Sequence, residues 1–402
     1  ACEHPDKACH GQSCPLARGY HDKLPAARAA AVAARWLDAA ALRELAMHHG
    51  LCPYHLAQDM IMWSDVVVGD YNHWFDSHAA LYALSLARGW RAAVLVDEAH
   101  NLIERARQMY SISLDEAGLS QARKAAPAEL KKDIDRLRRH WRALRLNRPA
   151  YSVLERLPQP MGLAMQQLHG RIAQWQSEHP TQPIGALQRL GFDLGEFLQR
   201  MGQLGSDSLI DLSLAPASDG PALLTIRNML PAPFLRSRFD ATQCCVLFSA
   251  TLSPSQHYLR LLGLPEETVT LDLPSPFESG QLHWDPDGEL TGSQQLIGAF
   301  IATLGLPQIN PVNEEIRRRL HALLGQGHEH VYLYPGLRKV MQAAGRVIRS
   351  ESDQGVLWLM DERYAQPRVQ DLLPAWWQPR FIAAPDDPAA VAGPLAPEAP
   401  TV

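Results

Sequence analysis

The sequence has no long apolar run, little net charge and few cysteines, and each shortage excludes a class of protein. None of its apolar stretches reaches 18 residues, which excludes a transmembrane helix of ordinary length. The formal net charge of -5 gives no field that would attract nucleic acid to the whole surface, so any basic site must be local. Six cysteines in 402 residues are too few for a disulfide scaffold. Because the start does not resemble a signal peptide, we predict a soluble cytoplasmic protein with no membrane partner.

The apolar pattern predicts an α/β protein. The chain is too long for one ordinary core, so we expect about two to four domains. Continuous apolar runs bounded by polar residues are typical of strands in parallel sheets, which are buried on both faces. Such runs occur at 65–70 (DVVVGD), 92–100 (AAVLVDEAH), 222–230 (ALLTIRNML), 244–254 (CCVLFSATLSP), 296–305 (LIGAFIATLG), 330–336 (HVYLYPG) and 355–361 (GVLWLMD). Helical sequence between these runs favours α/β layers with parallel sheets.

Residues 103–210 have a helical pattern without strand signals, and we predict an all-helical insertion there. Its most charged part, from Lys131 to Arg148, carries eight Lys or Arg residues. That helix could follow a phosphate backbone and offer one stacking ring, although a solvated helix face is the simpler explanation for most of its charges. The candidate DNA-binding residues are Lys131, Lys132, Arg138, Arg139, Trp141 and Arg142. The Pro- and Ala-rich residues 383–402 are predicted to be a disordered tail.

Two acids, Asp97 and Glu98, directly follow the apolar run AAVLV. Ligands of open α/β sheets bind at the carboxyl ends of strands. An Asp at such a strand end can hold Mg²⁺ against nucleotide phosphates, and a neighbouring Glu can polarise an attacking water. The alternative is that Asp97 caps the helix that follows it.

Two other short motifs make the nucleotide interpretation stronger. The first follows the run CCVLF with hydroxyl side chains that can couple a nucleotide site to a neighbouring surface, and it contains Ser249, Ala250 and Thr251. The second has a spacing that predicts both of its arginines on one side of a helix, and it contains Gln342, Gly345, Arg346 and Arg349. Arginines delivered from a second domain stabilise charge on a transferring phosphoryl group.

Four of the six cysteines lie near the start of the sequence, at Cys2, Cys9, Cys14 and Cys52. Four thiolates can hold either zinc or an iron-sulfur cluster, and the spacing alone slightly favours zinc because structural zinc is commoner. Cys244 and Cys245 lie in an apolar run, and we predict that they belong to the core.

Three motifs in this order, D-E-A-H, S-A-T and Q-x-x-G-R-x-x-R, resemble motifs II, III and VI of superfamily 2 helicases. Their surroundings, including DYNHWFD, SPF at 275–277 and LGLPQINPVNEEIRRR, resemble the XPD-like iron-sulfur DNA helicases of the DinG/YoaA branch. The resemblance extends over nearly the whole chain, up to about residue 382. It implies a 4Fe-4S cluster held by the four N-terminal cysteines, whose last member stands in a C-P-Y sequence.

The resemblance also implies a domain plan with two RecA-like parallel-sheet motor domains, both incomplete. The expected parts are an iron-sulfur domain at 1–58, motor domain 1 at 59–102 and 211–254, a helical Arch domain at 103–210, motor domain 2 at 255–382 and the tail at 383–402. In such helicases the cluster domain and the Arch flank the pore through which one DNA strand passes.

By resemblance, the intact protein would be an ATP-dependent, 5′-to-3′ DNA helicase of repair or replication, associated with the nucleoid. Its partners would be single-stranded and forked DNA, together with replication or repair proteins. Asp97 would hold Mg²⁺, Glu98 would orient the water, and His100 with Gln342 would link the nucleotide state to the motor interface. The resemblance implies that Arg346 and Arg349 reach the γ-phosphate. It also implies that Ser249, Ala250 and Thr251 couple ATP hydrolysis to DNA movement. The alternative is a non-catalytic, cluster-bearing or zinc-bearing protein that only binds single strands.

The sequence departs from this family in two places. It has no Gly-Lys dipeptide and therefore no G-x-x-x-x-G-K-S/T phosphate loop, so we expect that the sequence starts after that loop. The stretch 278–295 is shorter than the family's, which indicates an internal deletion or a junction of two segments. For both reasons we expect weak ATP turnover by this polypeptide alone.

Overall fold

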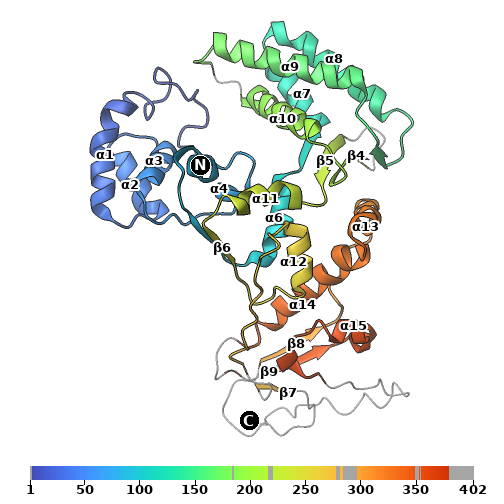
Figure 1. Ribbon diagram of the computed structural model, residues 1–402. Coiled ribbons are helices and arrows are strands. Elements are labelled where there is room, and N and C mark those ends of the chain that lie inside the picture. The colour runs from blue at the N-terminus through green and yellow to red at the C-terminus, as the bar shows by residue number, and fades with distance from the viewer. Residues whose placement is uncertain are drawn as a thin grey trace, which may run out of the picture. The chain divides into compact units, whose positions relative to one another are not determined.

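The computed structural model describes residues 2–182, 185–215, 221–277, 281–283, 297–348, 353 and 355–379. The chain divides into two compact units, Ala1–Thr268 and Val269–Val402, and each is described by itself (Figure 1). The predicted tail at 383–402 lies outside the described residues. Among the helices that are described, none is long and apolar enough to cross a membrane.

The first unit begins with a small helical part, residues 2–63, which we call the cysteine region. Its elements are α1 (Tyr20–Ala34), α2 (Ala39–His48), α3 (Pro53–Met60) and the short η1 (Ile61–Trp63). Small and aliphatic side chains from all three α-helices, such as Ala27, Ala46 and Leu56, form its core. Two bidentate ion pairs add to this packing: Arg28 binds Asp59 at 2.9 and 3.1 Å, and Arg43 binds Glu3 at 2.8 and 2.7 Å.

A two-stranded parallel sheet follows, formed by β1 (Ala93–Val96) and β6 (Cys244–Leu247) with Leu95 opposite Val246. Both strands were predicted from their apolar runs, and both are confirmed. The helices of this part are α4 (Asn72–Phe75), α5 (Ala80–Arg88), η2 (Ala99–Asn101), α6 (Leu102–Met109), α11 (Ala232–Asp240) and α12 (Ser255–Leu262). Because β1 and β6 each lead into one of the predicted motifs, this sheet positions the candidate site.

The strand predicted at 65–70 is wrong. Residues 66–70 have no regular secondary structure, and Val66, Val67 and Val68 are 77%, 44% and 86% exposed. Three β-branched residues in a row favour an extended backbone, but a strand also needs a neighbouring strand for its hydrogen bonds. The described residues provide none beside this segment.

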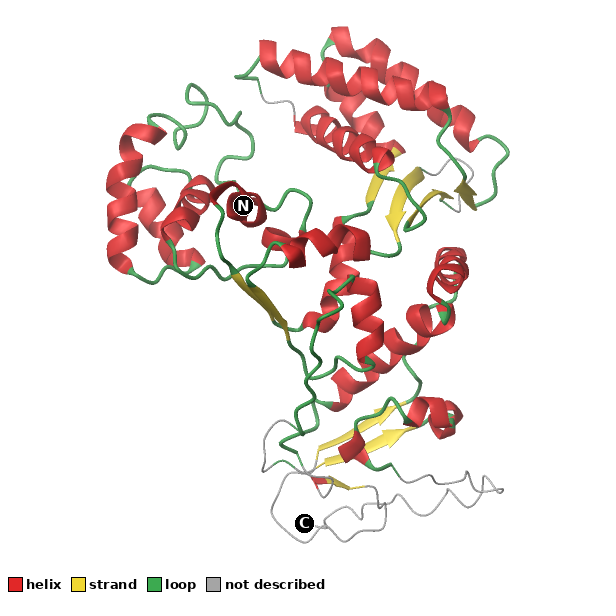
Figure 2. Ribbon diagram, in the orientation of Figure 1, coloured by secondary structure: helices red, strands yellow, loops and turns green. Residues whose placement is uncertain are grey.

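Residues 112–182, 185–215 and 221–228 form a layer of sheet and helices, which we call the mixed domain (Figure 2). Its antiparallel sheet has the order β2-β5-β4-β3, from β2 (Ile112–Asp115), β5 (Ala222–Asn228), β4 (Ser208–Leu214) and β3 (Tyr151–Leu154). Its helices are α7 (Glu116–Ala125), α8 (Ala128–Arg145), α9 (Gln159–Glu178) and α10 (Gly185–Gly202). The prediction of an all-helical insertion at 103–210 is therefore wrong, because β2 and β3 have only four residues each, too few to show a period of two.

The second unit contains a parallel sheet in the order β7-β9-β8, from β7 (Leu282–His283), β9 (Gly355–Leu359) and β8 (Ile297–Ile301). The apolar runs at 296–305 and 355–361 thus gave correct strands. Its helices are α13 (Pro311–Leu324), the π-helical η4 (Glu329–Leu333), α14 (Tyr334–Ala344), η5 (Glu362–Ala365), α15 (Pro367–Gln370) and η6 (Ala375–Trp377).

The strand predicted at 330–336 is wrong, because this segment is helical from η4 into α14. The buried residues that follow, Leu337, Val340, Met341 and Ala344, recur at helical spacing, and this period outweighs the short apolar run before it. Gly336 permits the close packing of α14, since a Cβ there would lie 2.6 Å from the carbonyl oxygen of Leu304.

Candidate functional site

The predicted acids lie where β1 ends. Both Asp97 and Glu98 are exposed, and the Oδ1 atom of Asp97 accepts a hydrogen bond of 2.7 Å from the backbone N–H of Glu98. The alternative that Asp97 caps a helix is wrong, since Glu98 is the cap residue of η2 and Asn101 that of α6. Two carboxylates are therefore presented to solvent at a strand end, as a metal and water site requires.

Glu98 has a left-handed backbone with φ of 46°. This conformation is uncommon for a residue with a side chain and persists only where surrounding contacts hold it. The next residue is held by the segment directly after β6, because the N–H of Ala99 donates to the carbonyl of Phe248 at 3.1 Å. The turn after β1 thus aims the Glu98 carboxylate while the chain enters η2.

His100 is 2% exposed and joins the two predicted motifs. Its Nδ1 atom lies 2.7 Å from the Ser249 hydroxyl and 3.1 Å from Oε2 of Glu98. The Ser249 hydroxyl in turn donates to Oε2 of Glu98 at 3.3 Å and accepts from the N–H of Thr251 at 3.3 Å. We call Asp97, Glu98, His100 and Ser249 the strand-end site. Three of its side chains contact one another, whereas Ala250 is exposed and adds no polar side-chain group.

Tyr71 belongs to this site and was not predicted as a site residue. Its hydroxyl oxygen lies 2.5 Å from the carbonyl oxygen of Asp97 and 3.0 Å from that of Glu98, so its one proton is shared between the two acceptors. Burial, followed by the nearby carboxylates of Asp97 and Glu98, raises the pKa of Tyr71 further above neutral pH. The signal in the sequence was DYNHWFD, which we used only for resemblance.

The residues of the third motif lie in the second unit. Gln342 is exposed on α14. This helix ends at Ala344, and the exposed Arg346 follows in a turn, where its N–H donates to the carbonyl of Ala343 at 3.2 Å. The prediction that both arginines share one side of a helix is therefore wrong for Arg346, and Arg349 lies outside the described residues.

The four N-terminal cysteines are close enough to interact electrostatically. Burial raises the pKa of the Cys9 thiol, and Cys14, Cys52 and Cys2 raise it further. The Sγ atom of Cys9 lies 3.8 Å from Nε2 of His55, a neighbour that sequence reasoning did not single out.

No group of three or more His, Cys, Asp or Glu side chains in the described part of the chain is arranged to hold a single metal ion. Four thiolates are a donor set that both structural zinc and a 4Fe-4S cluster take, so the chemistry of these side chains fits either group.

Comparison with known families agrees with the motif pattern. A family model described as DEAD_2 matches residues 1–119, and a model described as Helicase C-terminal domain matches residues 291–380. The first match includes the cysteine region, Tyr71 and the two acids, and the second includes α14 and Arg346. The matches place the chain in the XPD-like superfamily 2 helicase family.

Two relatives of this XPD-like chain have related sequences over short stretches. The helicase subunit XPD of general transcription and DNA repair factor IIH from Dictyostelium discoideum is 34% identical over 82 residues, which are 20% of this chain. The ATP-dependent DNA helicase chl-1 of Caenorhabditis elegans is 31% identical over 83 residues, again 20% of this chain. These matches span only 11% and 10% of the relatives' own lengths.

A solved structure entitled XPD_Helicase resembles the fold of the XPD-like chain. It has a TM-score of 0.50 and 14% sequence identity, and the match covers 82% of this chain and 76% of that one. At this identity the likeness shows the fold alone. It agrees with the prediction of an α/β protein with parallel sheets.

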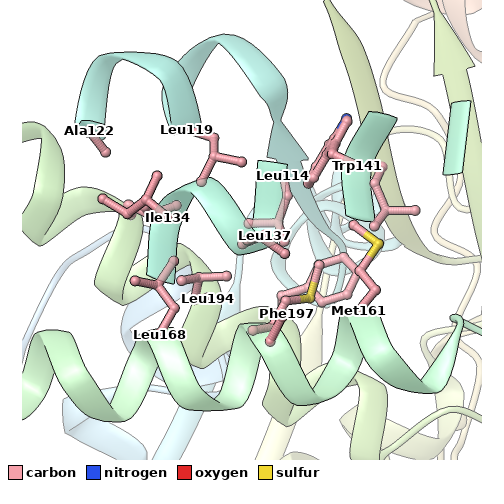
Figure 3. Packing of buried hydrophobic residues seen from close by; sticks show 14 of the residues in the cluster. Leu114, Leu119, Ala122, Ile134, Leu137, Trp141, Met161, Leu168, Leu194 and Phe197 are labelled. Atoms are coloured by element: carbon pink, nitrogen blue, oxygen red, sulfur yellow. The ribbon is translucent and has the colours of Figure 1, made fainter. Parts of the chain in front are cut away.

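The basic helix of the XPD-like chain corrects one part of the predicted DNA surface. Trp141 is 1% exposed and packs in the core of the mixed domain, so it cannot offer a ring to a base (Figure 3). Arg138 is half-buried and contacts Asp135 at 3.3 Å, and Lys131 is half-buried as well. The predicted residues that remain exposed are Lys132, Arg139 and Arg142.

Cys244 and Cys245 also differ from expectation. Cys244 is exposed and Cys245 is half-buried, so the prediction that both belong to the core is wrong. Burial nevertheless raises the pKa of the Cys245 thiol to about 12, which keeps that thiol protonated and unreactive near neutral pH.

Proposed function

We propose that this chain is part of an ATP-dependent DNA helicase of the DinG/YoaA branch, which couples ATP hydrolysis to 5′-to-3′ movement on single-stranded DNA. The observation that carries the proposal is the contact between two motifs far apart in the sequence. His100 reaches Ser249 at 2.7 Å and Glu98 at 3.1 Å, at the adjoining ends of two parallel strands. His100 thus connects the carboxylate of Glu98, which would orient the water, to the segment after the second strand. Coupling of ATP hydrolysis to movement requires such a connection.

Each residue of the strand-end site has a role in this proposal. Asp97 holds Mg²⁺, which would neutralise charge on the phosphates, and Glu98 orients the attacking water. The short contacts of His100 and Ser249 keep the Glu98 carboxylate in place, and Thr251 follows Ser249 in the same turn. Gln342, Arg346 and Arg349 act on the nucleotide, a role that is supported by the family resemblance.

The four N-terminal cysteines would hold a 4Fe-4S cluster. This part of the proposal is supported by the family resemblance and by the four-thiol donor set. Single-stranded and forked DNA are the proposed partners, with repair or replication as the process.

The test uses the product of the complete reading frame that contains this sequence. We expect DNA-stimulated ATP hydrolysis, and Glu98→Gln should lower its kcat by about 100-fold to 10,000-fold because it removes the group that orients the water. Glu266→Gln is a matched control, since Glu266 is an exposed carboxylate of the same unit. Hydrolysis that is insensitive to Glu98→Gln would reject this assignment.

A non-catalytic protein that only binds single strands is the second candidate, in which exposed cations such as Lys132, Arg139 and Arg142 would contact phosphates without nucleotide chemistry. It predicts DNA binding with no ATP hydrolysis above that of Glu98→Gln. A zinc protein would be colourless, whereas a cluster gives a brown protein that contains iron and acid-labile sulfide.

A further inference from the structure

Tyr71 stands at the point where the chain coming from the cysteine region meets the strand-end site. One hydroxyl contacts two carbonyl groups, at 2.5 Å for Asp97 and 3.0 Å for Glu98. These carbonyls belong to the peptide groups before and after the Cα atom of Glu98. The single phenol proton is shared between these two carbonyl oxygens. Because the orientation of two successive peptide planes defines φ and ψ, a proton shared between both planes restrains the backbone conformation of Glu98.

This conformation needs support. Glu98 is left-handed with φ of 46°, a region that residues with a side chain enter at a cost. Three backbone N–H groups also hold the turn: Glu98 donates to the Asp97 carboxylate, Ala99 donates to the carbonyl of Phe248, and Asn101 donates to the carbonyl of Glu98. Tyr71 adds a side-chain donor that reaches the carbonyl of Asp97 as well as that of Glu98.

Tyr71 itself is anchored on both sides along the chain. The preceding Asp70 accepts two hydrogen bonds of 2.8 Å from Arg105 of α6, and this interaction lowers the pKa of Asp70. Farther on, the indole N–H of Trp74 donates to the carbonyl of Arg238 at 3.2 Å, and Phe75 is 1% exposed. The phenol is thus presented by an anchored segment.

We propose that Tyr71 is a positioning residue that sets the backbone of Glu98 and thereby connects the segment leaving the cysteine region to the strand-end site. The mechanistic part of this inference rests on the proposed function, since it assigns Tyr71 an effect on hydrolysis through Glu98. The structural part depends only on the contacts of Tyr71 and can be tested without nucleotide.

Hydrogen exchange of the backbone amides of Ala99 and Asn101 tests the structural part on the chain itself. Ala99 donates to Phe248, and Asn101 donates to the carbonyl of Glu98 at 2.9 Å, so both amides report on the turn. Loss of the Tyr71 hydroxyl in Tyr71→Phe should speed their exchange roughly threefold to tenfold, the range expected for one lost hydrogen-bonding group. Unchanged exchange would overturn the proposal.

Tyr82→Phe is the matched control. The Tyr82 hydroxyl also donates to a backbone carbonyl, that of Ser237 at 3.3 Å, and it lies in the same unit but outside the strand-end site. This variant should leave the exchange of Ala99 and Asn101 unchanged. An equal acceleration in both variants would show that any lost hydroxyl loosens the unit, and it would also overturn the proposal.

The mechanistic part is measured on the product of the complete reading frame. Tyr71→Phe should lower kcat for ATP hydrolysis roughly tenfold and change KM for ATP by less than about twofold, since it displaces the water-orienting group more than the bound nucleotide. If Glu98→Gln abolishes hydrolysis and Tyr71→Phe does not affect it, the inference fails and the proposed function stands. If the unaltered protein does not hydrolyse ATP, the proposed function fails, and the exchange measurement still decides whether Tyr71 sets the turn.

Discussion

The antiparallel sheet of the mixed domain and the parallel β1–β6 sheet bury their apolar residues to different degrees. In the mixed domain, Leu212 and Leu224 are fully buried, and helices contribute further side chains to one continuous core. In the β1–β6 sheet, Leu95 is 70% exposed and Val246, its partner in register, is 49% exposed. The first sheet belongs to a part of the molecule with its own complete core. The β1–β6 sheet gains little stability from the face that carries Leu95 and Val246, and its main role is to position the strand-end site.

The largest expected change in the free energy of unfolding comes from a substitution in the core of the mixed domain. Trp141→Ala should lower the free energy of unfolding by about 3–5 kcal/mol, because it leaves a large cavity among closely packed side chains. Denaturant unfolding followed by circular dichroism measures this change. Trp36, which is 78% exposed, is the matched control, and Trp36→Ala should change stability by less than about 0.5 kcal/mol. Similar losses for the two variants would mean that the mixed domain is not the more stable part.

A smaller effect is expected in the β1–β6 sheet. Leu95→Ala should cost less than about 1 kcal/mol in the free energy of unfolding, since most of the side chain is already in water. Leu224→Ala, at a fully buried position of the mixed domain, should cost about 2–5 kcal/mol in the same measurement. A loss at Leu95 as large as that at Leu224 would break the comparison and show that the face with Leu95 and Val246 is covered in solution.

The smallest effect on stability is expected for the exposed cations of α8. Replacing Lys132, Arg139 and Arg142 together by Ser should change the free energy of unfolding by less than about 0.5 kcal/mol per site. If these residues bind single-stranded DNA, the negative slope of log affinity against log salt concentration should become shallower by about 0.7 for each lost phosphate contact. Trp141→Phe should leave DNA affinity unchanged, because the ring is buried. An unchanged salt slope in the triple variant would identify α8 as an ordinary solvated helix.

Sequence reasoning succeeded where the pattern was long or the motif was local. The runs around β1, β6, β8 and β9 gave real strands, and the polar residues after β1 and β6 do meet at adjoining strand ends. Parallel pairing brings two such ends to the same edge of a sheet, so this contact followed from the predicted fold.

It failed where partners or neighbours decide the structure. Whether Val66 to Val68 form a strand depends on a neighbouring strand, and the short β2 and β3 depend on β4 and β5 to pair with them. Trp141 lies in a very basic stretch, but its position on α8 matches the buried stripe of Ile134 and Leu137, which a helical period could have shown. Tyr71 acts through its hydroxyl on main-chain carbonyls, and the stretch DYNHWFD has no spacing that would assign such a contact.

The left-handed backbone of Glu98 has a consequence for engineering this chain. Glycine would adopt that backbone at lower cost, so Glu98→Gly is a substitution that a search for thermostable variants would favour. The same substitution would remove a carboxylate from the strand-end site. Stability thus favours glycine at this position, whereas the proposed chemistry needs glutamate. A variant selected only for heat resistance would lose the Glu98 carboxylate.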